Sequence, residues 1–372
     1  MPSRDLGSRV CLRIAGRLAV LLLAALAAAG CRPAAAPDPL AADVGRWSAL
    51  LQGHGAADAD WAEGRQAAEP GLASTEEALR GGRRLLALQR LAEVRVELAA
   101  AAYVRERSPA QRKDAAAFAA EWARMGTALR GDLGPPSPTA LAGVRPAAAR
   151  AIGEAALPQV RAYYQASLDY GRNTLPRYGL SYLGTAEALR QLVAFCRTLG
   201  DAFPGGREPR LRALDAEIDA LEGEVLAAYR PPASITRHGE FIGASSMLKE
   251  ARELNAAGLR YGALLRYLQA ALAVRQLRAA PPAADPAALA GRLREAEARL
   301  AADGLDHSIG RLFLEIAQAR VAAAAPRGSD ATTAAILDDV LPRYFAALAP
   351  APHQPPRPPA SVTVTLVRWP YT

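Results

Sequence analysis

Two side chains in this sequence have the types and spacing for covalent chemistry: Ser246 and Lys249, in the run Ser246-Met247-Leu248-Lys249. At the start of a helix, the lysine amine could help to move the proton of a serine hydroxyl that attacks a carbonyl carbon. The structural alternative is that Ser245 or Ser246 caps the helix and that Lys249 is solvated.

This S-x-x-K spacing resembles the nucleophile motif of penicillin-recognising serine enzymes, which also act outside the cytoplasm. The resemblance implies an attacking Ser246, but it ends with these four residues, because the chain contains neither an S-D-N nor a K-T-G motif. Those enzymes also need a central sheet, which a helical sequence cannot build. We therefore expect a capping serine, no acylation by penicillin and no catalytic residue.

Metal binding is not indicated either. The four histidines lie far apart in the sequence: His54, His238, His307 and His353. None has the second ligand that an H-E-x-x-H or paired-cysteine zinc site requires. The sequence thus predicts no metal and no cofactor.

The tyrosines gather in one stretch, residues 163–184, which holds five of the eleven in the chain. Tyrosine offers a flat apolar ring and a hydroxyl, which suits sugars and peptide partners. The alternative is that these rings pack in the core and only their hydroxyl groups reach solvent. The candidate ligand-binding residues are Tyr163, Tyr164, Tyr170, Arg172, Arg177, Tyr178 and Tyr182.

The N-terminal segment carries the strongest signal of location. Arginines at positions 4, 9, 13 and 17 precede an unbroken apolar run, Leu18 to Ala29. Twelve helical residues rise about 18 Å, which is too short for a hydrocarbon core of about 30 Å. The segment is therefore predicted to be an export signal and not a membrane span.

The run ends in Ala28-Ala29-Gly30-Cys31, which resembles the lipobox of bacterial lipoproteins. The resemblance implies cleavage after residue 30, lipid on Cys31, and a short tether over residues 31–40. Arg32 stands where an Asp commonly retains such proteins at the inner membrane, so the outer membrane, facing the periplasm, is expected. The alternative is an ordinary secretory peptide with a chance cysteine.

Composition limits the partners. The formal net charge is +8, the cations are almost all arginines, and they are interspersed with acids. We interpret this composition as the codon bias of a GC-rich genome and predict no nucleic-acid partner.

The cysteines predict no intramolecular disulfide. Cys11 leaves with the signal and Cys31 takes lipid, so Cys196 has no intramolecular partner. Its apolar surroundings predict a buried thiol.

Residues 41–349 show helical periodicity nearly throughout, which predicts an all-α fold, an array or bundle of antiparallel helices. Ser74-Thr75-Glu76-Glu77 is a capping box that predicts a helix to about residue 107, and Ser108 begins a second box. Residues 131–136 and 231–245 are expected loops. The second divides an N-terminal helical domain, 41–230, from a C-terminal one, 245–349.

Within that second loop, the polar run at positions 237–240, R-H-G-E, could bind an anion or a partner, or be solvated. Residues 246–279 beyond it resemble a tetratricopeptide hairpin, in the spacing of Tyr261 and Ala271, although Leu264 replaces a small residue. No sister unit follows at a 34-residue period. An ordinary helix pair is the alternative.

The C-terminus differs from the rest. Residues 350–359 are a Pro-rich linker, and residues 361–371 form the strongest strand signal of the chain. The tail could pair with a strand of a partner or fold back over the helices. The candidate partner-binding residues are Val362, Val364, Leu366, Trp369 and Tyr371.

These features together predict a non-catalytic, lipid-anchored scaffold or accessory subunit that binds another envelope protein. The rival expectation is a lipoprotein that binds a glycan or a small polar molecule at the tyrosine–arginine stretch. An unrecognised hydrolase is the third.

Replacement of the acylated thiol tests the anchor. We expect Cys31→Ser to abolish acylation and cleavage after residue 30, because the sulfur is the group that carries the lipid. Metabolic labelling with palmitate measures this. Label retained in the variant would contradict the lipoprotein interpretation.

Overall fold

The computed structural model describes residues 38–53, 59–173, 175–203, 205–231, 235–278, 286–324 and 331–348. This part of the chain is all-α, as predicted: its only β-type pairing is an isolated bridge between Arg207 and Leu305. None of its helices is long and apolar enough to cross a membrane. The predicted signal segment, Cys31 and the expected strand at 361–371 lie outside the described residues.

The helices follow one another in this order: α2 (Pro39–Gly53), α3 (Ala59–Arg80), α4 (Arg84–Arg105), α5 (Pro109–Lys113), α6 (Ala115–Ala128), α7 (Ala147–Asn173), α8 (Pro176–Cys196), η1 (Gly200–Ala202), α9 (Asp215–Ala228), η2 (Ile235–Arg237), α10 (His238–Ala256), α11 (Arg260–Leu277), α12 (Pro286–Ala301), α13 (Ser308–Ala324), α14 (Ala331–Ala335), the π-helical η3 (Ile336–Val340) and α15 (Leu341–Leu348).

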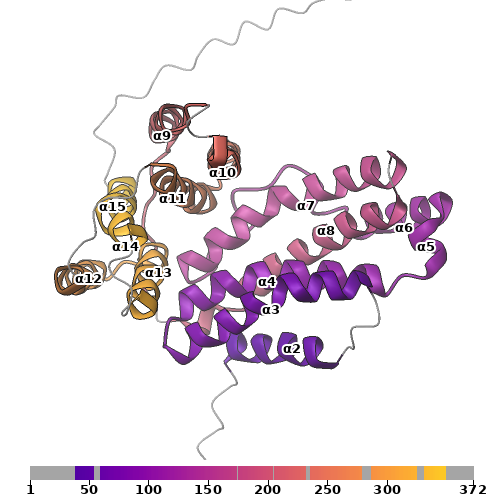
Figure 1. Cartoon of the computed structure of the whole chain (residues 1–372), viewed down its shortest axis with the longest axis horizontal. Coiled ribbons are helices and arrows are strands. Elements are labelled where there is room, and N and C mark those ends of the chain that lie inside the picture. The colour runs from indigo at the N-terminus through magenta and orange to yellow at the C-terminus, as the bar shows by residue number, and fades with distance from the viewer. Residues whose placement is uncertain are drawn as a thin grey trace, which may run out of the picture.

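Six of these helices form a continuous array. Helix α4 packs between α3 and α8, α8 packs on α7, α7 on α11, and α11 on α10 (Figure 1). Helix α13 closes the array by contacting both α4 and α7. Small residues and the apolar faces of the long helices make these close neighbours possible.

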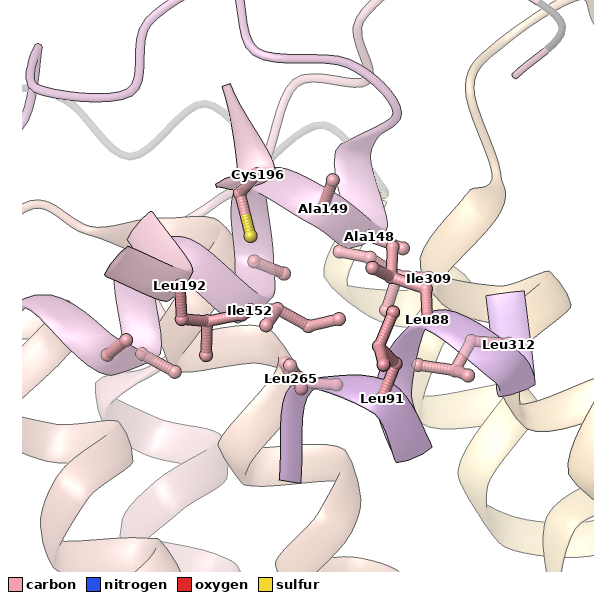
Figure 2. Close-up of a cluster of buried hydrophobic side chains, with 14 of the residues drawn as sticks. Leu88, Leu91, Ala148, Ala149, Ile152, Leu192, Cys196, Leu265, Ile309 and Leu312 are labelled. Atoms are coloured by element: carbon pink, nitrogen blue, oxygen red, sulfur yellow. The ribbon is translucent and has the colours of Figure 1, made fainter. Parts of the chain in front are cut away.

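The core runs through both halves of the chain. Leu88 of α4, Ile152 of α7, Leu265 of α11 and Ile309 of α13 meet in one buried cluster (Figure 2). Cys196 belongs to it as a free thiol, and burial raises its pKa to about 12. The prediction that this cysteine is a buried apolar residue is confirmed.

The predicted single helix over residues 74–107 is wrong. Thr75 lies inside α3, where its hydroxyl donates to the carbonyl of Gly71 at 2.8 Å. The chain then turns at Gly82, whose φ of +71° favours glycine, and Arg83 N–H bonds back to Ala78 O at 2.9 Å. This glycine C-cap ends α3 and lets α4 fold back beside it.

The second predicted capping box is confirmed. Ser108 accepts from the backbone of Gln111 at 3.2 Å, and the Gln111 side chain accepts from Ser108 N–H at 2.9 Å. The loop expected at residues 131–136 is also present.

The predicted loop over 231–245 is partly wrong. Helix α10 begins at His238, so the polar run at 237–240 forms its first turn and is not a loop. Ser246 is exposed in the middle of α10 and caps nothing. The Lys249 side chain is 79% exposed, as the structural interpretation of the S-x-x-K run requires.

Helices α10 and α11 pack as a pair joined by a tight turn at Gly258, with φ +77°. Tyr261, Leu264 and Ala271 are buried in this pair. The helix pair is therefore present, and its likeness to a tetratricopeptide unit stays a prediction.

Buried carboxylates cap helices from which they are remote in sequence. Glu315 of α13 accepts from Leu86 N–H at 2.8 Å, across 229 residues, and so caps α4, which has no side-chain cap of its own. Glu154 of α7 accepts from Gly262 N–H at 2.9 Å, across 108 residues, and caps α11 in the same way. Each bond satisfies a backbone donor that the start of a helix leaves unpaired.

The start of α7 is capped from the loop before α13. Asp306 accepts from Ala147 N–H at 2.7 Å and from Ser308 N–H at 3.0 Å. The hydroxyl of Ser308 accepts from Ala148 N–H at 2.8 Å. The starts of α4, α7 and α13 consequently meet in one junction.

The Glu315 carboxyl should make stability depend on pH. Burial raises its pKa from 4.5 to about 7. Between pH 4.5 and 7 the Glu315 carboxyl is therefore protonated in the folded chain and ionised in the unfolded chain. The free energy of unfolding falls as the pH rises through this window, by up to about 3 kcal/mol. Glu315→Gln cannot ionise but keeps a carbonyl acceptor for Leu86 N–H.

We expect the melting temperature of the wild type to fall more steeply than that of Glu315→Gln between pH 4.5 and 7. Thermal unfolding followed by circular dichroism measures this. Glu297→Gln, an exposed substitution on α12, is the matched control and should follow the wild type. Equal slopes for the wild type and Glu315→Gln would contradict the assignment.

Candidate functional site

Two glycines set the geometry of the tyrosine-rich stretch. A Cβ at Gly179 of α8 would lie 2.6 Å from the Phe118 ring and 2.7 Å from Gly171 Cα of α7. Only glycine fits at such an approach. The two helices therefore cross closely where their tyrosines stand.

Three of the predicted tyrosines come together as one aromatic cluster, Tyr163, Tyr170 and Tyr182. The Tyr170 and Tyr182 rings stack at 4.3 Å, and Tyr163 tilts against Tyr182 at 5.6 Å. A hydrogen bond with Tyr170, together with burial, raises the pKa of Tyr182 to about 12. Tyr182 is thus neutral at physiological pH.

Tyr164 and Arg172 do not join this cluster. Tyr164 is buried on a different face of α7 and stacks on Trp122 of α6 at 4.8 Å. Its hydroxyl donates to Trp122 O at 3.3 Å, so its role is structural. Arg172 is exposed near the end of α7.

Arg177 and Tyr178 line a cavity of about 250 Å³ between α3, α4 and α8. Tyr178 is 46% exposed, and the guanidinium of Arg177 lies 5.4 Å from its ring centre. Arg177 also faces Glu63 of α3 at 3.9 Å. These two predicted residues therefore stand at a cavity mouth.

A second cavity, of about 220 Å³, lies between α4, α7, α8 and α11 and contains Tyr163. Both cavities are lined by Glu97 of α4 and Thr185 of α8, so they adjoin. We call the combined depression the α4–α8 groove. Its other polar lining residues are Gln89, Glu93, Gln159, Arg266 and Gln269.

One wall of the groove is fixed by Glu250 of α10. Its carboxylate accepts from the Gln159 amide at 3.1 Å and pairs with Arg266 Nε at 2.8 Å. Arg266 in turn donates to Gln269 at 3.0 Å. This network neutralises Arg266 and leaves the other wall, on α4, to determine the charge of the groove.

The wall on α4 offers acceptors without partners. Gln89 donates to Glu93 at 2.9 Å, but its own Oε1 is buried and accepts no hydrogen bond from the described residues. Glu97 likewise makes no hydrogen bond or ion pair within this part of the chain. Burial, with Glu250 and Glu97 nearby, raises the pKa of Tyr163. The groove therefore favours a ligand that donates hydrogen bonds.

Sequence reasoning missed the contribution of α4 and α11 to this site. Gln89, Glu93 and Glu97 recur at four-residue spacing, which marks one polar face of a helix. That spacing was a usable signal, but the helix on the other side of the groove was not identifiable without the fold.

No family model, no curated protein and no solved structure matches this chain. The arrangement of the residues is thus the basis for the functional argument. Among the described residues, no group of three or more His, Cys, Asp or Glu side chains is placed to hold a metal ion.

Gly179→Ala tests the close crossing that positions the tyrosines. The added methyl must displace Phe118 or α7, so we expect a loss of stability of about 1–3 kcal/mol. Chemical denaturation measures it.

Gly223→Ala in α9 is the control. A Cβ there meets nothing within 4 Å, and alanine favours helix, so this variant should gain about 0.5–1 kcal/mol. A Gly179→Ala variant as stable as the wild type would show that α7 and α8 do not cross as described.

Proposed function

We propose that the protein is a lipid-anchored protein of the cell envelope, without a catalytic role, that binds another envelope component in the α4–α8 groove. The observation that carries this proposal is the pair of unpartnered acceptors, Gln89 Oε1 and the Glu97 carboxylate, beside the Tyr163 ring. Acceptors next to an aromatic face suit a donor-bearing, cationic group.

The form of the groove supports an extended occupant. Two adjoining cavities that share Glu97 and Thr185 follow α4 and α8 past α3 on one side and α7 and α11 on the other. Glu63, Glu93 and Glu97 line it, and Arg177 and Arg266 each face a carboxylate. A basic, extended segment of a partner protein is the occupant that this charge favours.

The anchor and the location belong to the same proposal. The apolar run before Cys31 supports lipidation there, and Arg32 supports the periplasmic face of an outer membrane. The C-terminal tail, with its alternating Val362, Val364 and Leu366, is proposed as a second contact with a partner.

Glycan binding is the second candidate function. The Tyr163 ring, which packs against Tyr182, and the amides of Gln89, Gln159 and Gln269 line the groove and supply the flat face and two-way hydrogen bonding that sugars use. This ligand would need the aromatic cluster more than the carboxylates.

Removal of one groove charge separates the two candidates. We expect Glu97→Gln to weaken the capture of a basic partner about tenfold, since a hydrogen bond to a charged group contributes about 1.5–3 kcal/mol. The measurement is quantitative mass spectrometry of proteins that co-purify from detergent-solubilised envelopes. Because Glu97 is exposed, the variant should fold normally.

Two further variants complete the experiment. Glu295→Gln, an exposed change on α12 far from the groove in sequence, is the matched control and should retain the partner. Tyr163→Ala should lose it. If the partner stays bound to both groove variants, the proposal is wrong; glycan-array binding that survives Glu97→Gln but not Tyr163→Ala would favour the glycan.

A further inference from the structure

The two cavities of the α4–α8 groove differ in what lines them. We call them the Tyr163 cavity, of about 220 Å³, and the Tyr178 cavity, of about 250 Å³. A protein cavity of about 150 Å³ is enough to hold a benzene ring. Each cavity therefore has room for one large side chain of a bound partner.

The Tyr163 cavity is acidic. Glu93 and Glu97 of α4 line it, and neither forms an ion pair with another described residue. Among its described lining residues, Arg266 alone is basic, and it pairs with Glu250 at 2.8 Å. Two unpaired carboxylates beside a tyrosine ring favour a cationic side chain here.

The Tyr178 cavity is closer to neutral. Glu63 and Arg177 both line it and face each other at 3.9 Å, and Glu97 lines it only at its boundary with the Tyr163 cavity. The remaining lining is rich in small apolar residues: Gly64, Ala67, Ala100, Ala101 and Val104. This cavity therefore favours an uncharged, aliphatic side chain.

Helices α4 and α8 set the distance between the two cavities (Figure 1). The α4 residues that line the Tyr163 cavity lie within 89–97, and those that line the Tyr178 cavity lie within 97–104. On α8, the corresponding ranges are 185–192 and 177–185. The average lining positions differ by about seven residues on α4 and about eight on α8, which at 1.5 Å per residue is about 11–13 Å.

This distance selects a spacing in an extended occupant. Side chains of an extended chain alternate between two faces, so two of them enter the groove together only if an even number of positions separates them. At about 3.3 Å per residue, residues four apart are about 13 Å apart, whereas residues two apart are only about 7 Å apart. Four residues is therefore the spacing that places one side chain in each cavity.

We propose that the groove binds an extended partner segment with one lysine or arginine in the Tyr163 cavity and one aliphatic side chain, four residues away, in the Tyr178 cavity. The inference rests on the function proposed above and specifies the partner's two anchor residues. The side chain midway between the anchors points at the boundary, where Glu97 and Thr185 stand. A small residue fits that position.

Peptide binding by the purified chain tests the spacing. The protein is the chain from residue 31 to 372 with Cys31→Ser, which keeps every described residue. The probes are fluorescent nine-residue peptides of serine and threonine that carry one lysine and one leucine, spaced by three, four or five positions and made in both orders. We expect fluorescence anisotropy to show the tightest binding at a spacing of four, by about tenfold, because only then are both anchors buried.

A variant that fills the Tyr178 cavity identifies the leucine site. Ala67 is exposed and lines this cavity, so Ala67→Phe should fold and occupy it. We expect this variant to lose the tenfold advantage of the spacing-four peptide, and to bind a peptide with serine in place of leucine as the unfilled protein does. Ala73→Phe is the matched control, since Ala73 is exposed on the same helix and lines neither cavity.

The outcomes separate this inference from the proposed function. Equal affinities at all spacings would overturn the spacing, while weakening of all of them by Glu97→Gln would still support a basic partner in the groove. Tightest binding at a spacing of three would also overturn it, because that register belongs to a polyproline helix with about 3.1 Å per residue. So would the absence of binding by every peptide, whatever the envelope capture experiment shows.

Discussion

The fold depends on capping the starts of α4, α7 and α11 from parts of the chain that are remote in sequence. A helix start leaves N–H groups unpaired, and leaving one buried without a partner costs about 1–3 kcal/mol. Helices α4 and α11 have no cap of their own, and Glu315 and Glu154 supply it from α13 and α7. These bonds favour the observed neighbours, because each satisfies a backbone donor only when the two helices lie together. The cap from Glu154 also shapes the α4–α8 groove, because it holds α11 against α7.

The helical fold could be predicted from the sequence, and its arrangement could not. Periodicity identified residues 41–349 as helical nearly throughout, and Ser108 marked a helix start correctly. The box at Ser74 misled because local capping chemistry also occurs inside helices, where Thr75 bonds back to Gly71. Gly82 was a better indicator than Ser74 of where one helix ends and the next begins. Contacts across 108 to 229 residues leave no local trace, so the remote caps were invisible.

The candidate site, too, could be predicted from the sequence only in part. Tyr163 and Tyr170 lie on the face of α7 that meets Tyr182, so their clustering follows from a hairpin of two helices. Tyr164 is one position on, and a step of about 100° around a helix with 3.6 residues per turn turns it to Trp122. The acceptors on α4, such as Glu97, entered the site only through the fold.

The remote caps also bear on how the chain acquires its structure. Helix α4 is near the beginning of the chain, and the carboxylate that completes its first turn is in α13. A nascent chain that ends before α13 lacks Glu315 and Asp306 together, so the starts of α4 and α7 are left open. Contacts of high sequence separation form late, because long loops must close first. The first helices of such a chain are therefore less stable until α13 has been made, which would suit the export proposed above.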